Sequence, residues 1–549
     1  MASVNEYVRI AEALMAAPGY DAWKGYVRHV MPRLIPAGEL ATMPDDGLPE
    51  RVCAHARTAV LKLASAFSVM ITPRGVNWFR YEPLGGQEDV PDDEKDWYAK
   101  VTQVVQKELE GGNFYPQLLG HIVDHICAGT GLTLTEADER TGGVVFTHIP
   151  AGTYRLAENK HHEIDTVVRK FKYTAHQLAQ AFGLEALDAD MRKAWENKEE
   201  RYRQEFVVWH LVCPRDVAPA GNGREVKAAL SMSWASVYIA EGSKQVLAEG
   251  GYHEFPYMAT RFLKAGNQVY GDSALAGVAS VVEDYLEVEE SMKEGVKAAV
   301  FPRVLASPDM AGEIDMRAGG VTLLSPEAGQ SGLPREWATV ARQHEGLAAL
   351  EGYKAEIDAG LFVDQLQTVS MVERQMTARE VVARENEKLM TFSQTFTQFT
   401  ADFRPLMERV FCVLWRAERF PRVGEPEGLF VPVGGGKGVK VLAPGVKYLG
   451  KLSKALESAK QGGLVESLNF AVEMYQATQD ASWMDYFKPY ECMKFVTDES
   501  NVDVGCVRST AEAKQQAAAR EQAAAMQQQA AMMEQMSGAA RNYAQAERL

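Results

Sequence analysis

Two histidines one helical turn apart come closest, in residue type and spacing, to a metal site. His121 and His125 are four residues apart with Asp124 between them, and this spacing places both imidazoles on one face of a helix, as a zinc site requires. The order resembles the inverted His-x-x-Glu-His motif, but an aspartate replaces the glutamate and no third ligand follows nearby. We therefore assign neither a metal ion nor a cofactor to this chain.

Phosphate binding is the second chemistry that the sequence suggests. Glycine amides can cradle a phosphate while a lysine supplies charge, and the chain contains Gly434-Gly435-Gly436-Lys437. The match to a phosphate loop fails at Val431, where the first glycine belongs, and at Gly438, where a serine or threonine would hold magnesium. We interpret this stretch as a flexible β-turn.

Catalytic arrangements of other kinds are not evident in the sequence. No Gly-x-Ser-x-Gly nucleophile motif occurs, and the carboxylates lie on helix faces with no spacing that selects an acid and a base. The stretch His161-His162-Glu163 has no regularly spaced partner, and we interpret it as a surface turn. These observations predict that the chain is not an enzyme.

Length and charge limit the remaining function classes. The chain has 549 residues, 46% of them apolar and 24% charged, and we expect about two to four substructures. A net charge of −16 argues against a broad basic face that grips nucleic acid. This charge does not argue against a channel protein through which DNA passes, because a weakly repulsive channel wall lets a polyanion slide without trapping it. Charge that serves only solubility is the simpler explanation.

Cysteine usage and hydropathy indicate a reducing compartment and no membrane. The cysteines are scattered without a CxxC pair or metal-ligand spacing, so we expect reduced thiols; they are Cys53, Cys127, Cys213, Cys412, Cys492 and Cys506. The N-terminus lacks a basic region followed by an apolar run, and no apolar stretch is long enough for a membrane helix. We expect neither a signal peptide nor a membrane span.

Periodicity places helices and strands along the chain. Apolar residues recur at helical spacing over 50–71, and further helices are expected at 97–110 and 114–127, the last turning through 128–131 into a strand at 132–135. Residues 143–253 are rich in strand-like runs, with one polar helix at 174–182. These elements predict an α+β fold.

Two amphipathic helices flank a glycine- and proline-rich excursion. The first begins near Leu275 and carries apolar residues on one side and glutamates towards the other, namely Glu283, Glu287, Glu290 and Glu294. The second spans 345–364, and residues 303–343 between them have short strands at 304–305 and 321–324. Another helix follows residue 377, and the tract after residue 510 is rich in Ala, Gln and Met, which favours helix.

A resemblance to a known family rests on three segments. Met376-Thr377-Ala378-Arg379-Glu380-Val381 starts a helix with a capping box between Thr377 and Glu380. It resembles the segment after the tunnel loop in portal proteins, the head-to-tail connectors of short-tailed, podovirus-type bacteriophages. Tyr270-Gly271-Asp272-Ser273 before a long helix resembles the entry to the connector stem, and the helix-Ala-Gly-strand unit at 114–135 is similar to one in connectors.

The resemblance implies a portal fold with a defined order of parts. These are an α/β wing (1–272), a first stem helix (273–300), a small β-containing clip (301–344), a second stem helix (345–364) and a tunnel loop (365–376). A long helix returning to the wing (377–440), a helical crown (441–505) and an Ala/Gln/Met-rich helical barrel or tail (506–549) would follow. The tunnel loop would face DNA through residues that include Gln365, Gln367, Glu373, Arg374 and Gln375.

The resemblance also implies a function. Twelve copies would form a ring at the capsid vertex of the virion, with double-stranded DNA passing through its channel, without sequence recognition, during genome packaging and ejection. The ring would dock the packaging terminase, then the tail adaptor protein, and would contact capsid and internal core proteins, after assembly in the host cytoplasm. Two alternatives stay open: a structural adaptor without a channel, and a hydrolase whose carboxylates are not recognisable.

Overall fold

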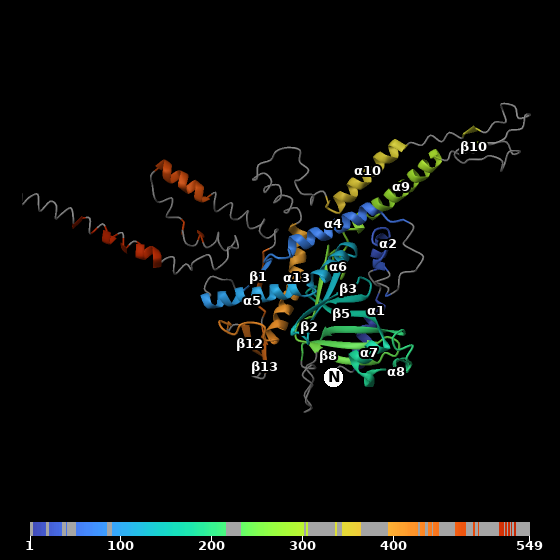
Figure 1. Cartoon of the computed structure of the whole chain (residues 1–549), viewed down its shortest axis with the longest axis horizontal. Coiled ribbons are helices and arrows are strands. Elements are labelled where there is room, and N and C mark those ends of the chain that lie inside the picture. Colours follow the sequence, from blue (N-terminus) through green and yellow to red (C-terminus); the bar gives the residue numbers. More distant parts are fainter. Residues whose placement is uncertain are drawn as a thin grey trace, which may run out of the picture.

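The computed structural model describes residues 4–17, 21–35, 40, 51–84, 91–215, 232–300, 304–305, 335–336, 343–363, 393–426, 429–433, 438–441, 443–449, 467–478 and short pieces between 487 and 533. These residues form an α+β fold, as the sequence predicted, with helices packed on small antiparallel sheets (Figure 1). None of the described helices is both long and apolar enough to cross a membrane.

Helices surround the main hydrophobic core. They are α4 (Ala54–Ile71), α5 (Asp92–Gly111), α6 (Phe114–Cys127) and α13 (Ser393–Arg416). The predicted helices at 50–71, 97–110 and 114–127 are confirmed, and α13 continues through Pro405. Aromatic side chains fill the space between them, and Phe67, Phe114, Phe399 and Phe403 are all nearly inaccessible to solvent. Burial of this apolar surface is what holds helices from distant parts of the chain together.

A three-stranded sheet continues from α6. Helix α6 ends at Cys127, and Gly129 with φ 75° redirects the chain into β2 (Thr130–Asp138). Strand β2 lies between β3 (Gly143–Ile149) and β9 (Tyr257–Arg261), antiparallel to both. The predicted helix, turn and strand at 114–135 are therefore confirmed.

A five-stranded antiparallel sheet forms a second lobe. Its strands are β4 (Tyr154–Glu158), β5 (Ile164–Thr174), β6 (Glu205–Pro214), β7 (Trp234–Ala240) and β8 (Val246–Tyr252), in sequence order. One face packs on α1 (Val4–Ala16), the other on α7 (Ala175–Phe182) and α8 (Ala189–Glu196). The predicted polar helix is α7, which begins with a capping box of Thr174 and Gln177. Helix α8 was not predicted.

A pair of helices projects from the body (Figure 1). Helix α9 (Ala279–Val300) follows the short helix η3 (Ala276–Val278), and α10 (Gln343–Gly360) packs against it. Both predicted amphipathic helices are confirmed within a few residues. The excursion between them contains β10 (Val304–Leu305) and β11 (Arg335–Glu336), which pair antiparallel. The strand expected at 321–324 lies outside the described residues.

The region after α13 returns to the body. Strands β12 (Phe430–Val433) and β13 (Gly438–Val441) pair across the glycine-rich stretch 434–437, which itself lies outside the described residues. Strand β14 (Gly445–Tyr448) pairs with β1 (Phe79–Glu82) near the other end of the chain. Strand β14 lies within the range 441–505 that the resemblance assigns to the crown. Residues 467–478 are helical, as predicted.

Candidate assembly and channel elements

Two glycines let α10 approach α9 and the preceding helix η3 closely. A side chain at Gly346 would collide with Met292, and one at Gly360 would collide with Val278. The inner faces are apolar: Tyr285 and Leu286 of α9 and Ile357 of α10 are buried in the main core. The pair is therefore a packed unit whose base is fixed in the body.

Helix α4 contacts both members of this pair. His55 Nε2 lies 2.9 Å from Asp358 Oδ1 on α10, and Arg51, which precedes α4, forms an ion pair with Glu290 on α9. Both contacts are partly exposed, so each contributes little to stability. Their value is geometric, because they fix how the helix pair meets α4.

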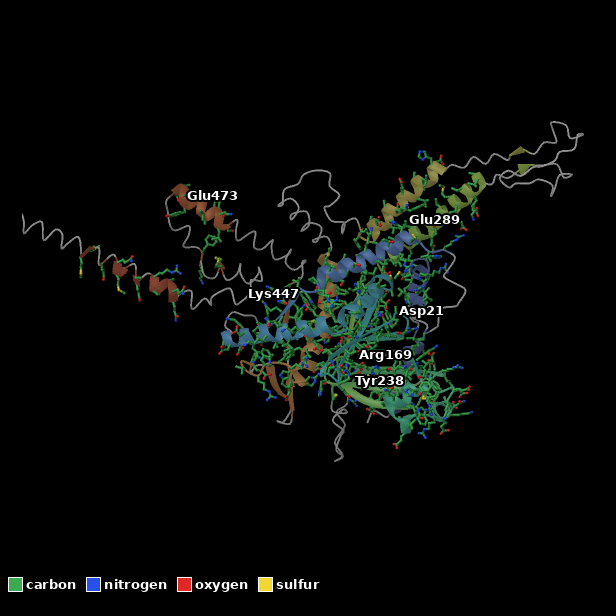
Figure 2. The ribbon with its side chains drawn as sticks, viewed as in Figure 1. Asp21, Arg169, Tyr238, Glu289, Lys447 and Glu473 are labelled. Carbon is green, nitrogen blue, oxygen red and sulfur yellow. The ribbon has the colours of Figure 1, made fainter. Side chains whose placement is uncertain are left out.

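The outer side of α9 is acidic. Glu283, Glu287 and Glu294 recur at spacings of four and seven residues, so they lie on one face, and all three are exposed. Together with Arg51, Glu290 and other residues they line a hollow of about 520 Å³. Glu289, labelled on α9 in Figure 2, pairs with Lys293 at 3.2 Å. The sequence predicted this acidic face but not the hollow, which needs residues from the segment before α4.

Buried residues of the main core lie on either side of the segment that contains the tunnel-loop candidates. Leu361 and Val363 are buried where the chain leaves α10. Phe399, in the second turn of α13, is buried, with its ring centroid 4.8 Å from that of His125. Gln365, Gln367, Glu373, Arg374 and Gln375, and the Thr377 capping box, lie outside the described residues.

Asp402 fixes α13 against β9. Its Oδ2 accepts a hydrogen bond from the backbone N–H of Arg261 at 3.1 Å, and its Oδ1 accepts one from Gln398 at 3.0 Å. Burial raises the pKa of Asp402 to about 6, although these hydrogen bonds and the charge of Arg261 act in the opposite direction.

A cluster of charged side chains joins α13 to the turn between β8 and β9. Glu254 accepts hydrogen bonds from Arg409 at 2.6 Å and from Arg416 at 2.6 and 2.7 Å. Burial tends to raise the pKa of Glu254, but the hydrogen bonds and charges of the two arginines outweigh it, and the pKa lies below its ordinary value. This cluster fixes the C-terminal half of α13 against the sheet region.

The histidines that resembled a metal site are used for packing. The Oγ1 atom of Thr133 lies 2.8 Å from Nδ1 of His121. The Oγ1 atom of Thr260 contacts both rings, at 2.7 Å from Nε2 of His121 and 2.9 Å from Nδ1 of His125. Asp124 turns away to accept hydrogen bonds from the ring of His148 and the backbone of Ala151, each at 2.8 Å. Within the described part of the chain, no three His, Cys, Asp or Glu side chains gather as metal ligands.

Burial keeps these rings neutral. It lowers the pKa of His125 to about 3 and the pKa of His121 well below its ordinary value. Threonine hydroxyls satisfy three of the four ring nitrogens, so the two histidines hold α6 to β2 and β9. The i, i+4 spacing reflects a helix face that packs on a polar part of the sheet.

Sequence reasoning missed a serine–histidine pair in the five-stranded sheet. Ser236 Oγ lies 2.9 Å from His210 Nε2, an arrangement that hydrolases use. However, the other ring nitrogen faces Arg169 and Tyr257, both at 3.2 Å, instead of a carboxylate. The His210 ring also stacks on Tyr238 at 4.1 Å, and Figure 2 labels Arg169 and Tyr238 in this sheet.

This pair has the properties of a structural contact. His210 is fully buried, and burial and the Arg169 charge lower its pKa well below the ordinary value. A neutral histidine beside a guanidinium is a poor general base, because no anion stabilises the imidazolium that proton transfer would create. His210 and Ser236 lie on different strands, β6 and β7, and are 26 residues apart in sequence, so no local motif could have indicated the pair.

Comparison with known proteins decides the family. Residues 15–507 match the family model of the bacteriophage head to tail connecting protein. This chain belongs to that family. The predicted resemblance to phage head-to-tail connectors is confirmed, and the connector is a structural component of the virion, placed between head and tail.

A portal protein is among the proteins to which the chain is similar. The chain is 24% identical over 394 residues to the portal protein of Salmonella phage epsilon15, covering 70% of this chain and 67% of that protein. Among solved structures it is similar to a chain of the virion of a native gene transfer agent particle, with 10% identity and a TM-score of 0.34. That superposition covers 74% of this chain and 86% of the other.

Proposed function

We propose that this chain is a portal protein, which forms a ring with a central channel at one capsid vertex and serves genome packaging and ejection. The family match supports this function, and the arrangement of α9, β10, β11 and α10 supports the assignment of parts. A close helix pair with its base in the body and a β-containing excursion at its far end suits two stem helices and a clip (Figure 1).

The channel would be lined in part by the segment between α10 and α13. Val363 directly before residues 364–392 and Phe399 in the second turn of α13 after them are buried in the core, so the segment runs between two fixed points, as a loop reaching towards a ring axis would need. Gln365, Gln367, Glu373, Arg374 and Gln375 are the proposed contacts to duplex DNA. They would touch phosphate without reading bases.

The proposed partners follow from the position of such a ring. Twelve copies would assemble in the host cytoplasm, and the clip would dock first the packaging terminase and then a tail adaptor protein. Capsid and internal core proteins would contact the remaining surface. The motor would supply the energy for packaging, and this chain would not be an enzyme.

Negative-stain electron microscopy of the purified full-length chain tests the proposal. Rings of uniform size with a central hole, about twelve-fold, are the expected result. Oligomers without a hole would favour a structural adaptor, and monomers across a range of salt concentrations would overturn the proposal and return attention to a hydrolase.

A separate test addresses the channel residues. Arg374→Glu should leave ring formation unchanged and lower the amount of DNA packaged when the variant replaces the natural protein in phage assembly, because it removes a proposed contact to phosphate. Arg140→Glu is the matched control, since Arg140 lies at the turn between β2 and β3 with 85% of its side chain exposed. Equal packaging by the two variants would exclude Arg374 from the channel.

A further inference from the structure

A closed ring of identical subunits needs two different surfaces on each copy. In such a heterologous contact one face of a subunit meets another face of its neighbour. The following inference rests on the proposed ring and identifies the two faces. They are the acidic side of α9, with the hollow beside it, and the exposed side of α4.

The α9 surface combines charge with a space that a side chain could enter. The hollow of about 520 Å³ is rimmed by Glu283, Glu287, Glu290 and Glu294, and Leu286, which is 5% exposed, is its apolar lining residue on α9. Of these glutamates only Glu290 has an ion-pair partner among the described residues, namely Arg51. The residues of α9 that meet α10, such as Met292, lie on the other side of the helix, so the partner helix does not cover this face.

The α4 surface has the opposite charge. Its exposed residues recur at spacings of three and four, so they form one stripe; they are Ala54, Thr58, Leu61, Ser65 and Val69. Leu61 and Val69 are 42% and 53% exposed, which is high for aliphatic side chains. Arg57 and Lys62 flank the stripe, and both are exposed.

The polar groups in this stripe are already satisfied within the helix. Thr58 Oγ1 donates a hydrogen bond to the carbonyl of Ala54 at 2.9 Å, and Ser65 Oγ donates one to the carbonyl of Leu61 at 2.8 Å. Burying the stripe against another protein therefore leaves no hydroxyl donor without a partner. A surface of small residues with internally bonded hydroxyls allows a second helix to come close.

We propose that, in the assembled ring, the α4 stripe of one copy docks on the acidic face of α9 in the next copy. Leu61 enters the hollow and contacts Leu286, while Arg57 and Lys62 reach the glutamates on its rim. The stripe from residue 54 to 69 is about 22 Å long at 1.5 Å per residue, and the glutamate face from 283 to 294 about 16 Å, so one helix can lie along the other. Charge complementarity of this kind fixes the register and speeds encounter.

A charge exchange tests the pairing. One variant carries Arg57→Glu and Lys62→Glu, a second carries Glu283→Lys, Glu287→Lys and Glu294→Lys, and a third carries all five changes. Each of the first two should lower the yield of closed rings at least ~10-fold, because like charges then face each other. The third should restore the rings, since attraction returns with reversed signs. Arg140→Glu with Lys193→Glu is the matched control on other exposed positions and should assemble like the unchanged protein.

The outcomes separate this inference from the proposed function. If the unchanged chain forms no rings, the proposed function fails. If it forms rings and both charge-reversed variants form them equally well, the ring stands and the α4–α9 contact is wrong. Loss of rings in both variants without recovery in the combined one also overturns the contact.

Cysteine cross-linking gives a second measurement that does not depend on charge. Leu61→Cys and Ser291→Cys in one chain place a thiol on the stripe and another on the rim of the hollow. Oxidation of assembled rings should produce a ladder of disulfide-linked oligomers that reducing agent collapses to a single band. Either cysteine alone should give no ladder, and the absence of a ladder from the double variant would contradict the contact.

Discussion

The buried body and the projecting helix pair satisfy their side chains in different ways. In the body, around α6, β2, β9 and α13, even histidines and threonines bond to each other out of contact with water. In α9 and α10 the apolar faces are buried near the body, while charged residues of the outer face and apolar residues near the far end remain exposed, among the latter Val296, Val300 and Leu347 at 47 to 64%.

This difference indicates where partners bind. The buried side chains of the body have their packing partners within one subunit, so a substitution there should change folding. The helix pair and the outer side of α4 leave side chains exposed in one subunit, so a substitution there should change assembly more than folding. The predictions that follow test this division.

The largest effect is expected at Gly129, where the body has no spare space. Gly129 has φ 75°, and a side chain there would collide with the backbone of Gly271 and Asp272. Gly129→Ala should lower the free energy of unfolding by at least about 3 kcal/mol, because strain at positive φ adds to a collision with backbone that cannot move aside. Urea unfolding of the full-length chain measures it. An unchanged midpoint would mean that the junction between α6 and β2 is not tightly packed.

Removal of Glu254 should have the next largest effect. Glu254→Ala leaves Arg409, whose side chain is only 6% exposed, without its carboxylate partner. We expect a loss of about 2–3 kcal/mol, below the range for a fully buried pair because 26% of the Glu254 side chain is exposed. Arg404→Ala on the same helix is the control, since its ion pair with Glu408 is exposed and contributes little.

The pH dependence of this loss has a defined sign. The pKa of Glu254 is lower in the folded state than its ordinary value of 4.5. Its stabilising contribution is therefore complete above that value and disappears as the pH falls through the folded-state pKa. The difference between the unchanged protein and Glu254→Ala should be constant near neutral pH and shrink below about pH 4. A difference that grew on acidification would contradict the assigned shift.

The same division explains what the sequence could predict. Elements with strong local periodicity were predicted well: α6 runs over Phe114–Cys127 as expected, and the helix pair was found from its spacing of apolar residues. The pairing of β14 with β1 was not, because Phe79 and Tyr448 are far apart in sequence and neither strand alternates for long enough to be distinctive. The α+β class could be predicted because it depends on which helices and strands are present and not on which strands pair.

In the candidate site too, local features could be predicted from the sequence and contacts between distant segments could not. The acidic face of α9 lies within one helix, so the sequence showed it, whereas the hollow and the Glu254 cluster join segments that are distant in sequence. The packing role of the histidine pair could not be predicted for the same reason, because the partners Thr133 and Thr260 lie on strands that only folding brings near. The five tunnel-loop candidates stay a prediction.

A smaller effect with the opposite sign is expected at Asp402 in the body. Its folded-state pKa of about 6 lies above the ordinary value of 3.8, so the folded protein holds a proton that the unfolded chain releases. Stability therefore falls as the pH rises from about 4 to 6, and the cost stays constant above that range. Asp402→Asn should stabilise the chain by on the order of 2 kcal/mol at pH 8 and by nothing below pH 4, since Asn keeps an acceptor for the Arg261 N–H. Thermal unfolding at both pH values measures this, and an equal effect at both would exclude titration as its cause.

The smallest effect is expected in α10, where two glycines differ in their surroundings. A side chain at Gly352 meets no atom within 4 Å, whereas one at Gly346 meets Met292 of α9. Gly352→Ala should stabilise the subunit by roughly 0.5–1 kcal/mol, because alanine loses less conformational entropy in a helix. Gly346→Ala should gain less, since Met292 must move to make room. Equal gains in thermal unfolding would show that α9 and α10 are not in close contact at that end, and the paired helices would then owe their arrangement to neighbouring subunits instead of to each other.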